Sequence, residues 1–311
     1  MFSPSYLKAL IVFVSISALI GVFTYDVVDY TQYIHRFTRT TETHPKGRND
    51  DSPVAGGIPL RIMFIGASIS RGEQSTGDRG YRKHIRDTLT GWGNDVNCVG
   101  FTRFGDWEDN DVEAWGAYRI RTITKHAVQS VPAVQPNLIL VQVGTSDCFQ
   151  HDDTENIGSR MRLLADTMLE ADPQATVILS TLTTTPNPEF EPCIVDANRQ
   201  IRDIANDLIK ESKPVILTEM HYDQGLPGRP KPEDIGPDRI HPTDEGYIMM
   251  GDIFLEGIRN VEWKGFLQRP ANNSIPDNGD DGREVEDRLK KEAEAEHPIN
   301  PKSKGRVPKS M

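Results

Sequence analysis

The chain is organised around residues 60–72, whose sequence is LRIMFIGASISRG. The apolar run 62–65 has the length and composition of a buried strand. The run stops at Gly66, and a serine hydroxyl follows two residues later, at Ser68. Open α/β sheets bind ligands beyond the carboxyl ends of their strands, so Ser68 is a candidate site residue. On this stretch alone, a serine that only caps a turn is the favoured interpretation.

Strand and helix patterns alternate after this stretch. The predicted strands are 60–66, 95–101, 137–143, 175–182 and 214–219. Between and after them, helical spacing of apolar residues predicts helices at 78–92, 117–130, 156–170, 195–211 and 243–258. The alternation predicts an α/β fold, a three-layer α/β/α sandwich with a five-stranded parallel sheet in the flavodoxin-like order 2-1-3-4-5.

Composition divides the chain into four parts. The uncharged, almost wholly apolar run 9–23 predicts that residues 1–25 are a signal peptide or a single-pass membrane anchor. We therefore expect a secretory-pathway protein, secreted or anchored with its domain facing the lumen or the extracellular space. Residues 26–58 are predicted as a polar linker, 59–262 as the folded domain, and 263–311 as a disordered charged tail with at most a solvated helix near 283–296. The tail contains a glycosylation sequon at Asn272.

Charge and cysteine content exclude some classes of protein. Acidic residues outnumber basic ones by 46 to 35, which argues against a nucleic-acid partner. Three cysteines allow at most one disulfide. Cys98 lies in an apolar run and is predicted as a buried free thiol, whereas Cys148 and Cys193 follow strand ends and are the favoured pair; two unpaired thiols remain the alternative.

A second informative motif, residues 238–242, has the sequence DRIHP and precedes the last predicted helix. An aspartate three residues before a histidine can orient the imidazole, as in the base half of a serine triad. Alone, this spacing is more often a surface coincidence. Together with the serine at the end of the first strand, the motif no longer stands alone.

The order of these motifs resembles the SGNH (GDSL-like) hydrolase family over about residues 60–260, and the branch of acetylxylan and other carbohydrate esterases in particular. Further matches are Gly80-Tyr81-Arg82, Val99-Gly100, Glu113-x-Trp115-Gly116-x-Tyr118-Arg119-Ile120, Gly144-Thr145-Ser146-Asp147, Asp196-x-Asn198 and His241-Pro242-x-x-x-Gly246-Tyr247. The resemblance implies that Ser68 is the nucleophile, His241 the general base and acid, and Asp238 the residue that orients His241. It also implies that no cofactor is needed.

The resemblance implies an oxyanion hole made of the Ser68 backbone N–H, a backbone N–H at Ala117 (or at Gly116 if the loop shifts by one) and the side chain at position 146. Three positions depart from the family pattern: Ala67 replaces an aspartate, Ala117 a glycine and Ser146 an asparagine. The change at Ala117 is mild if φ stays negative. The change at Ser146 is not mild, because losing one oxyanion donor costs on the order of 10² to 10³ in turnover.

Other sites are weaker. The spacing around Ser68 lacks the last glycine of an α/β-hydrolase elbow and the further glycines of a dinucleotide site. Four other histidines lack metal-ligand spacing and are predicted to be structural or at the surface: His84, His126, His151 and His221. Three aromatic residues beside the site could stack on a sugar, although core positions are favoured for them: Trp107, Trp115 and Tyr118.

The sequence therefore predicts a serine esterase that removes an acyl group, with acetyl favoured, from a carbohydrate or a similar small ester. Two alternatives remain open at this point. One is a lipid or thioester hydrolase of the same fold. The other is a catalytically weak module that binds glycan, which the residues at positions 67 and 146 suggest.

Overall fold

The computed structural model describes residues 51–299. The expected signal peptide or anchor in residues 1–25 lies outside these residues, as does most of the expected linker. Across 51–299, no helix is both long enough and apolar enough to cross a membrane.

Seven strands form one sheet in the described part of the chain. They are β1 (Leu60–Gly66), β2 (Val96–Val99), β3 (Thr102–Arg103), β4 (Asp111–Ala114), β5 (Leu138–Gln142), β6 (Thr176–Ser180) and β7 (Val215–Thr218). The five predicted strands are β1, β2, β5, β6 and β7, and they pair in parallel in the predicted order. The predicted strand number is wrong, because the segment expected to be a loop after β2 forms β3 and β4.

Strand β1 shares one of its edges between two partners. Its first residues pair with β2, from Leu60 opposite Val96, and its last two pair with β4. Gly100 lies where one partner gives way to the other, and a Cβ there would approach the Val112 carbonyl carbon to 2.2 Å. Strand β4 thus returns the chain to the carboxyl edge of the sheet, where β1 ends.

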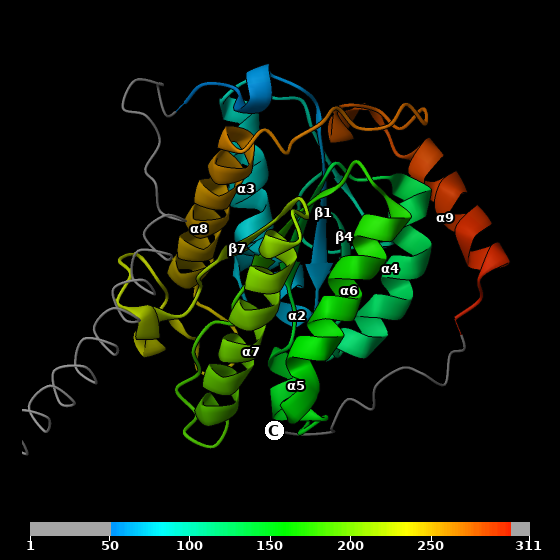
Figure 1. Cartoon of the computed structure of the whole chain (residues 1–311). Helices are drawn as coiled ribbons and strands as arrows, with labels where there is room; N and C mark the ends of the chain where they lie inside the picture. The colour runs from blue at the N-terminus through cyan, green and yellow to red at the C-terminus, as the bar shows by residue number, and fades with distance from the viewer. Residues whose placement is uncertain (1–50, 300–311) are drawn as a thin grey trace, which may run out of the picture. The chain divides into compact units, whose positions relative to one another are not determined.

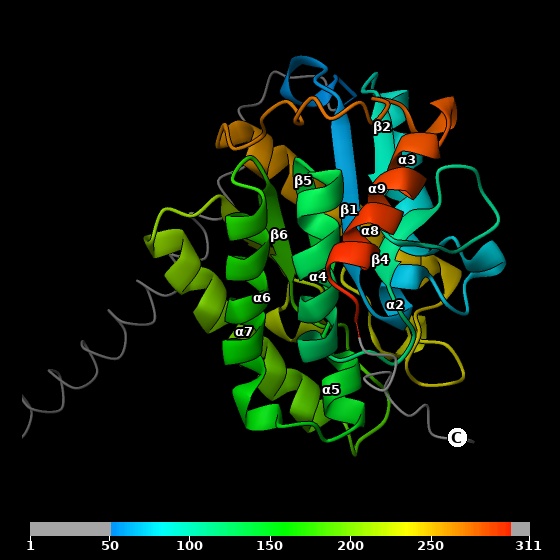
Figure 2. The same cartoon turned by 90° about the vertical axis from the view of Figure 1, so that its right-hand side faces the viewer.

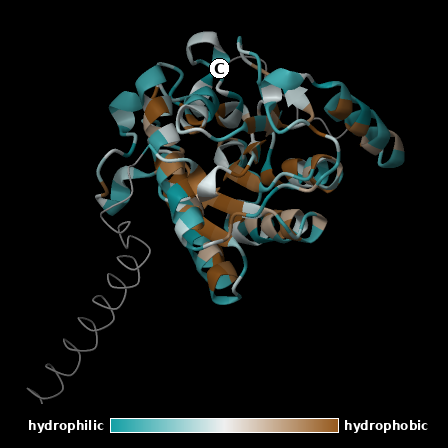
Figure 3. Cartoon of the chain, turned by 90° about the horizontal axis from the view of Figure 1, so that it is seen from above, coloured by the Kyte–Doolittle hydropathy of each residue, from teal (hydrophilic) through white to brown (hydrophobic). Residues whose placement is uncertain are grey.

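Helices cover both faces of the sheet (Figure 1). Helices α3 (Gly80–Gly91) and α8 (Asp244–Trp263) pack on one face, and α4 (Ile120–Val134), α6 (Ile157–Ala171) and α7 (Glu191–Lys210) pack on the other. Short helices α2 (Ser68–Arg71) and α5 (Thr145–Phe149) follow β1 and β5. Figure 3 shows the hydrophobic strands at the centre and the hydrophilic helix surfaces outside, which confirms the predicted three-layer sandwich.

Both predicted domain boundaries need correction. Before β1, Val54 is fully buried and exchanges two hydrogen bonds with Asn94, at 2.8 and 3.0 Å, so residues near it are part of the domain and not of a linker. After α8, helix α9 (Glu284–Glu296) lies beside α4 (Figure 2) and packs Val285, Leu289 and Ala293 against the core.

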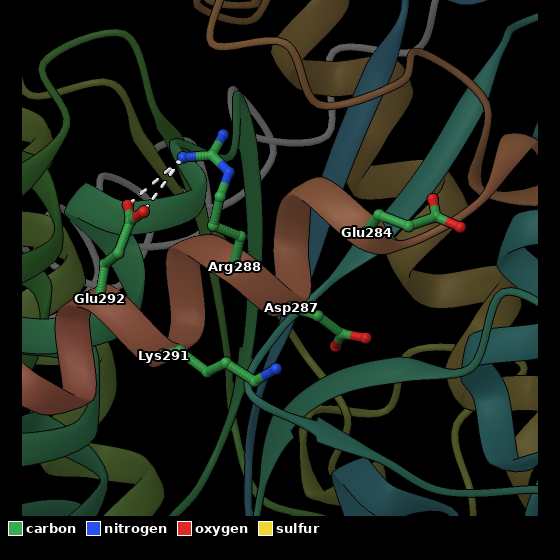
Figure 4. A pocket seen from close by; sticks show the side chains of 5 residues that line it. All are labelled: Glu284, Asp287, Arg288, Lys291 and Glu292. Carbon is green, nitrogen blue, oxygen red and sulfur yellow. Dashed lines mark hydrogen bonds and ion pairs between the residues drawn. The ribbon is translucent and has the colours of Figure 1, made fainter.

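Polar contacts hold the segment between α8 and α9. The Arg61 guanidinium donates hydrogen bonds to the carbonyls of Ala271 and Ile275, and Asn97 donates to the Pro276 carbonyl and to Glu286. Residues 263–299 are therefore ordered, contrary to the expected disordered tail, because these bonds add to the burial of the few apolar side chains of the segment. The helix expected near 283–296 is α9, which packs on the core and is not merely solvated. A shallow pocket on α9 is lined by charged side chains (Figure 4): Glu284, Asp287, Arg288, Lys291 and Glu292. None of these is a predicted site residue.

Candidate active site

Ser68 is the first residue of α2, directly beyond the carboxyl end of β1, and is half-buried. The tight turn before it requires Gly66, where a Cβ would approach the Gln142 carbonyl oxygen to 2.1 Å. Ser70 fixes the helix, because its hydroxyl donates to the same carbonyl at 2.9 Å and accepts a hydrogen bond from the Tyr81 hydroxyl at 3.0 Å. The structure thus places the predicted nucleophile at the sheet edge where ligands bind in such folds.

Asp238 and His241 form a hydrogen-bonded pair in the loop between β7 and α8. The Nδ1 atom of His241 lies 2.6 Å from Oδ2 of Asp238, and Oδ1 accepts the backbone N–H groups of Ile240 and His241. Burial raises the pKa of the Asp238 carboxyl, but the hydrogen bonds from His241 and from the two backbone N–H groups outweigh burial and hold the pKa below its ordinary value. Asp238 is therefore an anion at neutral pH and orients the imidazole.

The other ring nitrogen of His241 is available. Its Nε2 atom is buried and has no hydrogen-bond partner within residues 51–299. Ser68 and His241 are not hydrogen-bonded to each other in this structure. The structure thus forms the Asp238–His241 half of the predicted constellation and leaves unpaired the atom that would accept the serine proton.

The loop after β4 brings the predicted backbone donors close to α2. A Cβ at Gly116 would lie 2.8 Å from Glu73 Oε1, and Glu73 is ion-paired with Arg71 of α2 at 2.8 Å. Ala117 has a φ of 61°, and its carbonyl accepts a hydrogen bond from Gln150 at 2.7 Å. The condition of a negative φ at Ala117 is therefore not met, and alanine in this left-handed conformation costs roughly 1–2 kcal/mol.

Ser146 lies on α5, half-buried, and its hydroxyl makes no hydrogen bond with another described residue. The next residue, Asp147, is fully buried, accepts the backbone N–H of Ile120 at 3.0 Å and pairs with Arg160 at 3.1 Å. Burial raises the pKa of Asp147 to about 6, against these hydrogen bonds. Asp147 joins the helix that carries Ser146 to the start of α4, just after the Gly116–Ala117 loop; the sequence showed it only as a matching motif residue.

A family model for the GDSL-like lipases and acylhydrolases matches residues 64–248. The chain belongs to this family. No curated protein matches the chain. This GDSL-like chain is accordingly a serine ester hydrolase.

Solved structures of similar fold include esterases and an acylhydrolase. The family 3 carbohydrate esterase of Clostridium thermocellum is 20% identical, with a TM-score of 0.56 over 65% of this chain and 98% of the other. A family 3 carbohydrate esterase from Talaromyces cellulolyticus is 18% identical, with a TM-score of 0.56 over 66% and 99% of the two chains. A lipase/acylhydrolase from Enterococcus faecalis is 14% identical, with a TM-score of 0.51 over 68% and 98%. At these identities the likeness shows a shared fold.

A disulfide stabilises the α5 side of the site in this GDSL-like hydrolase. Cys148 of α5 is bonded to Cys193 in the first turn of α7, with 5.7 Å between their Cα atoms, which confirms the favoured pairing. Cys98 is a buried free thiol, as predicted.

The remaining histidines and aromatic residues of the hydrolase have structural contacts. His126 packs against Trp115 with 3.8 Å between ring centroids, and Trp115 stacks on Tyr118 at 5.6 Å. Both aromatic residues are partly buried and pack against the core, as the favoured interpretation predicts. The other aromatic residue and histidines also have neighbours: Trp107 packs on Arg82, His84 binds Asp252, His151 contacts Phe190, and His221 binds Glu191. Within 51–299, no group of side chains is arranged to hold a metal ion.

Proposed function

We propose that Ser68, His241 and Asp238 form the catalytic triad of an esterase that removes acetyl groups from carbohydrates. The observation that carries the proposal is the Asp238–His241 hydrogen bond combined with a buried, unpartnered Nε2 atom on His241. An imidazole that is oriented through Nδ1 and free at Nε2 is prepared to take a proton from a serine hydroxyl.

The reaction would proceed through an acyl-enzyme. As the Ser68 hydroxyl attacks the ester carbonyl, its proton moves to His241 Nε2, and the Asp238 anion stabilises the imidazolium that forms. His241 then gives this proton to the departing sugar oxygen. Water, activated by the same imidazole, releases the acid and restores the serine. None of these steps requires a cofactor.

The negative oxygen of the tetrahedral intermediate needs donors that are already in place. We assign this role to the backbone N–H of Ser68, to a backbone N–H at Gly116 or Ala117, and to the hydroxyl of Ser146. The absence of another hydrogen bond on the Ser146 hydroxyl, within the described residues, supports this assignment. A serine hydroxyl is shorter than an asparagine amide, so we expect slower turnover than an asparagine at this position would allow.

The evidence for a carbohydrate substrate and an acetyl group is separate from the evidence for the triad. They rest on the sequence resemblance and on the fold shared with two carbohydrate esterases of family 3. The same serine chemistry would also suit a lipid ester or a thioester, so the acyl chain and the leaving group have to be tested directly.

Labelling with a fluorophosphonate probe tests the triad without knowledge of the substrate. We expect the wild type to be labelled and Ser68→Ala not to be, while Ser159→Ala, which changes an exposed serine on α6, reacts like the wild type. Rates are then compared on acetylated xylooligosaccharides, a long-chain lipid ester and an acyl thioester. Preference for either of the last two would replace the carbohydrate assignment. Absence of labelling, with turnover no higher than that of Ser68→Ala on all three, would support the glycan-binding alternative.

A further inference from the structure

The loop tip that carries Asp238 and His241 is closed on itself. Gly236 donates its backbone N–H to the His241 carbonyl at 2.7 Å, and Arg239 donates to the Gly236 carbonyl at 2.9 Å. Among residues 51–299, the Asp238 carboxylate bonds only to Ile240 and His241, the latter through both backbone and ring. Internal bonds of this kind shape the tip but do not fix where it lies over the sheet.

One hydrogen bond connects this tip, residues 236–241, to another segment among the described residues. The Thr185 hydroxyl donates to the Arg239 carbonyl at 2.5 Å. Arg239 lies between the two functional residues and has a φ of 62°, a conformation that an arginine keeps only when its surroundings hold it. The Thr185 bond is therefore placed where it can fix both the strained residue and the neighbouring imidazole.

Thr185 is itself firmly held. It is 4% exposed, in the loop between β6 and α7, and its backbone N–H donates to Glu191 Oε2 at 2.9 Å. The other oxygen of Glu191 accepts the Thr184 hydroxyl at 2.9 Å and His221 Nε2 at 3.0 Å. His221 is almost fully buried, so the Glu191 carboxylate is held from several sides.

We propose that Thr185 and Glu191 are positioning residues for His241: Glu191 fixes the loop after β6, and the Thr185 hydroxyl then holds the Arg239 carbonyl in place. The inference rests on the proposed triad. It adds the Thr185–Arg239 hydrogen bond as the contact that fixes the position of the His241 loop relative to Ser68. The rate of proton transfer depends steeply on where His241 lies relative to Ser68, since a displacement of about 1 Å can cost on the order of 10² in rate.

Adjacent threonines provide a matched pair of variants. Thr185→Val removes the hydroxyl that reaches Arg239, whereas Thr184→Val removes a hydroxyl that bonds to Glu191 and does not reach the loop tip. We expect Thr185→Val to lower kcat on an acetyl ester by about 10- to 100-fold with KM changed less than about twofold, and the rate of fluorophosphonate labelling to fall equally. Thr184→Val and the conservative Thr185→Ser should keep kcat within about threefold of the wild type.

Thermal unfolding of each variant separates a lost position from a lost fold. If Thr185→Val does not fold, Thr185→Ala against Thr184→Ala gives the same comparison without an added methyl group. Equal kcat values in the Thr185 and Thr184 variants, with the wild type labelled and active, would overturn this inference and leave the triad standing. A wild type that is neither labelled nor active would overturn the triad and this inference with it.

Discussion

Breaking the Cys148–Cys193 disulfide should lower the stability of the domain by an amount set mainly by the length of chain that it closes. The two cysteines are 45 residues apart. In the chain-entropy description, a closed loop of this length raises the free energy of unfolding by about 4 kcal/mol. The double variant Cys148→Ala/Cys193→Ala avoids an unpaired thiol, and we expect it to lose about that amount. For a domain of this size, the loss corresponds to a fall in Tm of roughly 8–16 °C.

The assay is urea unfolding of the wild type and the double variant, each with and without dithiothreitol. Dithiothreitol should lower the stability of the wild type to that of the double variant and leave the double variant unchanged. Cys98→Ala, which removes the buried free thiol, controls for the loss of a sulfur atom and should remain sensitive to the reductant. A double variant within about 1 kcal/mol of the wild type, with no effect of dithiothreitol on either protein, would refute the reasoning.

Three further outcomes are expected. Ser146→Asn should restore an amide donor to the oxyanion site and raise kcat about tenfold with little change in KM; an equal or lower kcat in steady-state assays would count against an oxyanion role for this position. Glu113 is fully buried, and burial raises its pKa from the ordinary value of 4.5 to about 7. Between these two pH values the carboxyl is mostly protonated in the folded state and mostly ionised in the unfolded state. Its stabilising contribution is therefore complete below about pH 4.5 and disappears as the pH rises through 7, and Tm should fall from pH 5 to pH 8 less steeply in Glu113→Gln than in the wild type. A chain that ends at Gln268 loses the buried Ile275 and the apolar face of α9. Its free energy of unfolding, measured by urea denaturation, should be about 3 kcal/mol lower than that of the full chain. An unchanged urea midpoint would show that this segment does not stabilise the domain.

The five parallel strands were predictable because each is a short, mainly apolar run, as expected for strands that helices cover on both sides. Strand β4 was not, because half of its residues are carboxylates. Asp111 is buried against Arg103 and Arg283, and Glu113 accepts the backbone N–H of Phe101 at 2.8 Å. Arg103 and Phe101 lie 8 and 12 residues before the acids that they contact, and Arg283 lies far along the chain. The short pattern of the strand itself therefore could not indicate that the two acids were buried.

The segment after α8 was misjudged for a similar reason. Its composition predicts disorder, because it has few large apolar residues to bury. Arg61 of β1 donates hydrogen bonds to two backbone carbonyls of this segment. The order of residues 263–299 therefore depends on long-range polar contacts and on the burial of a few apolar side chains, and composition indicates neither.

The candidate site was predicted in its local parts. Ser68 follows a strand end, and Asp238 and His241 are three residues apart, so both features can be recognised in short windows. The left-handed backbone of Ala117 and the contact between Thr185 and Arg239 depend on how separate loops meet at the sheet edge. Neither residue type nor spacing indicates them.

The described chain begins near the amino ends of the strands, and its last helix runs toward their carboxyl ends. Val54 is bound to Asn94, just before β2, so the chain enters beside the starts of the strands, about 20 Å of β1 away from Ser68. Helix α9 runs the other way along α4: Pro276 contacts Asn97 ahead of it, whereas Lys290 reaches the Phe101 carbonyl beyond the end of β2. A fusion partner or a solid support joined directly ahead of residue 51 would therefore leave the carboxyl edge of the sheet, with Ser68, accessible. The same partner or support joined after α9 would lie on the side from which substrates approach.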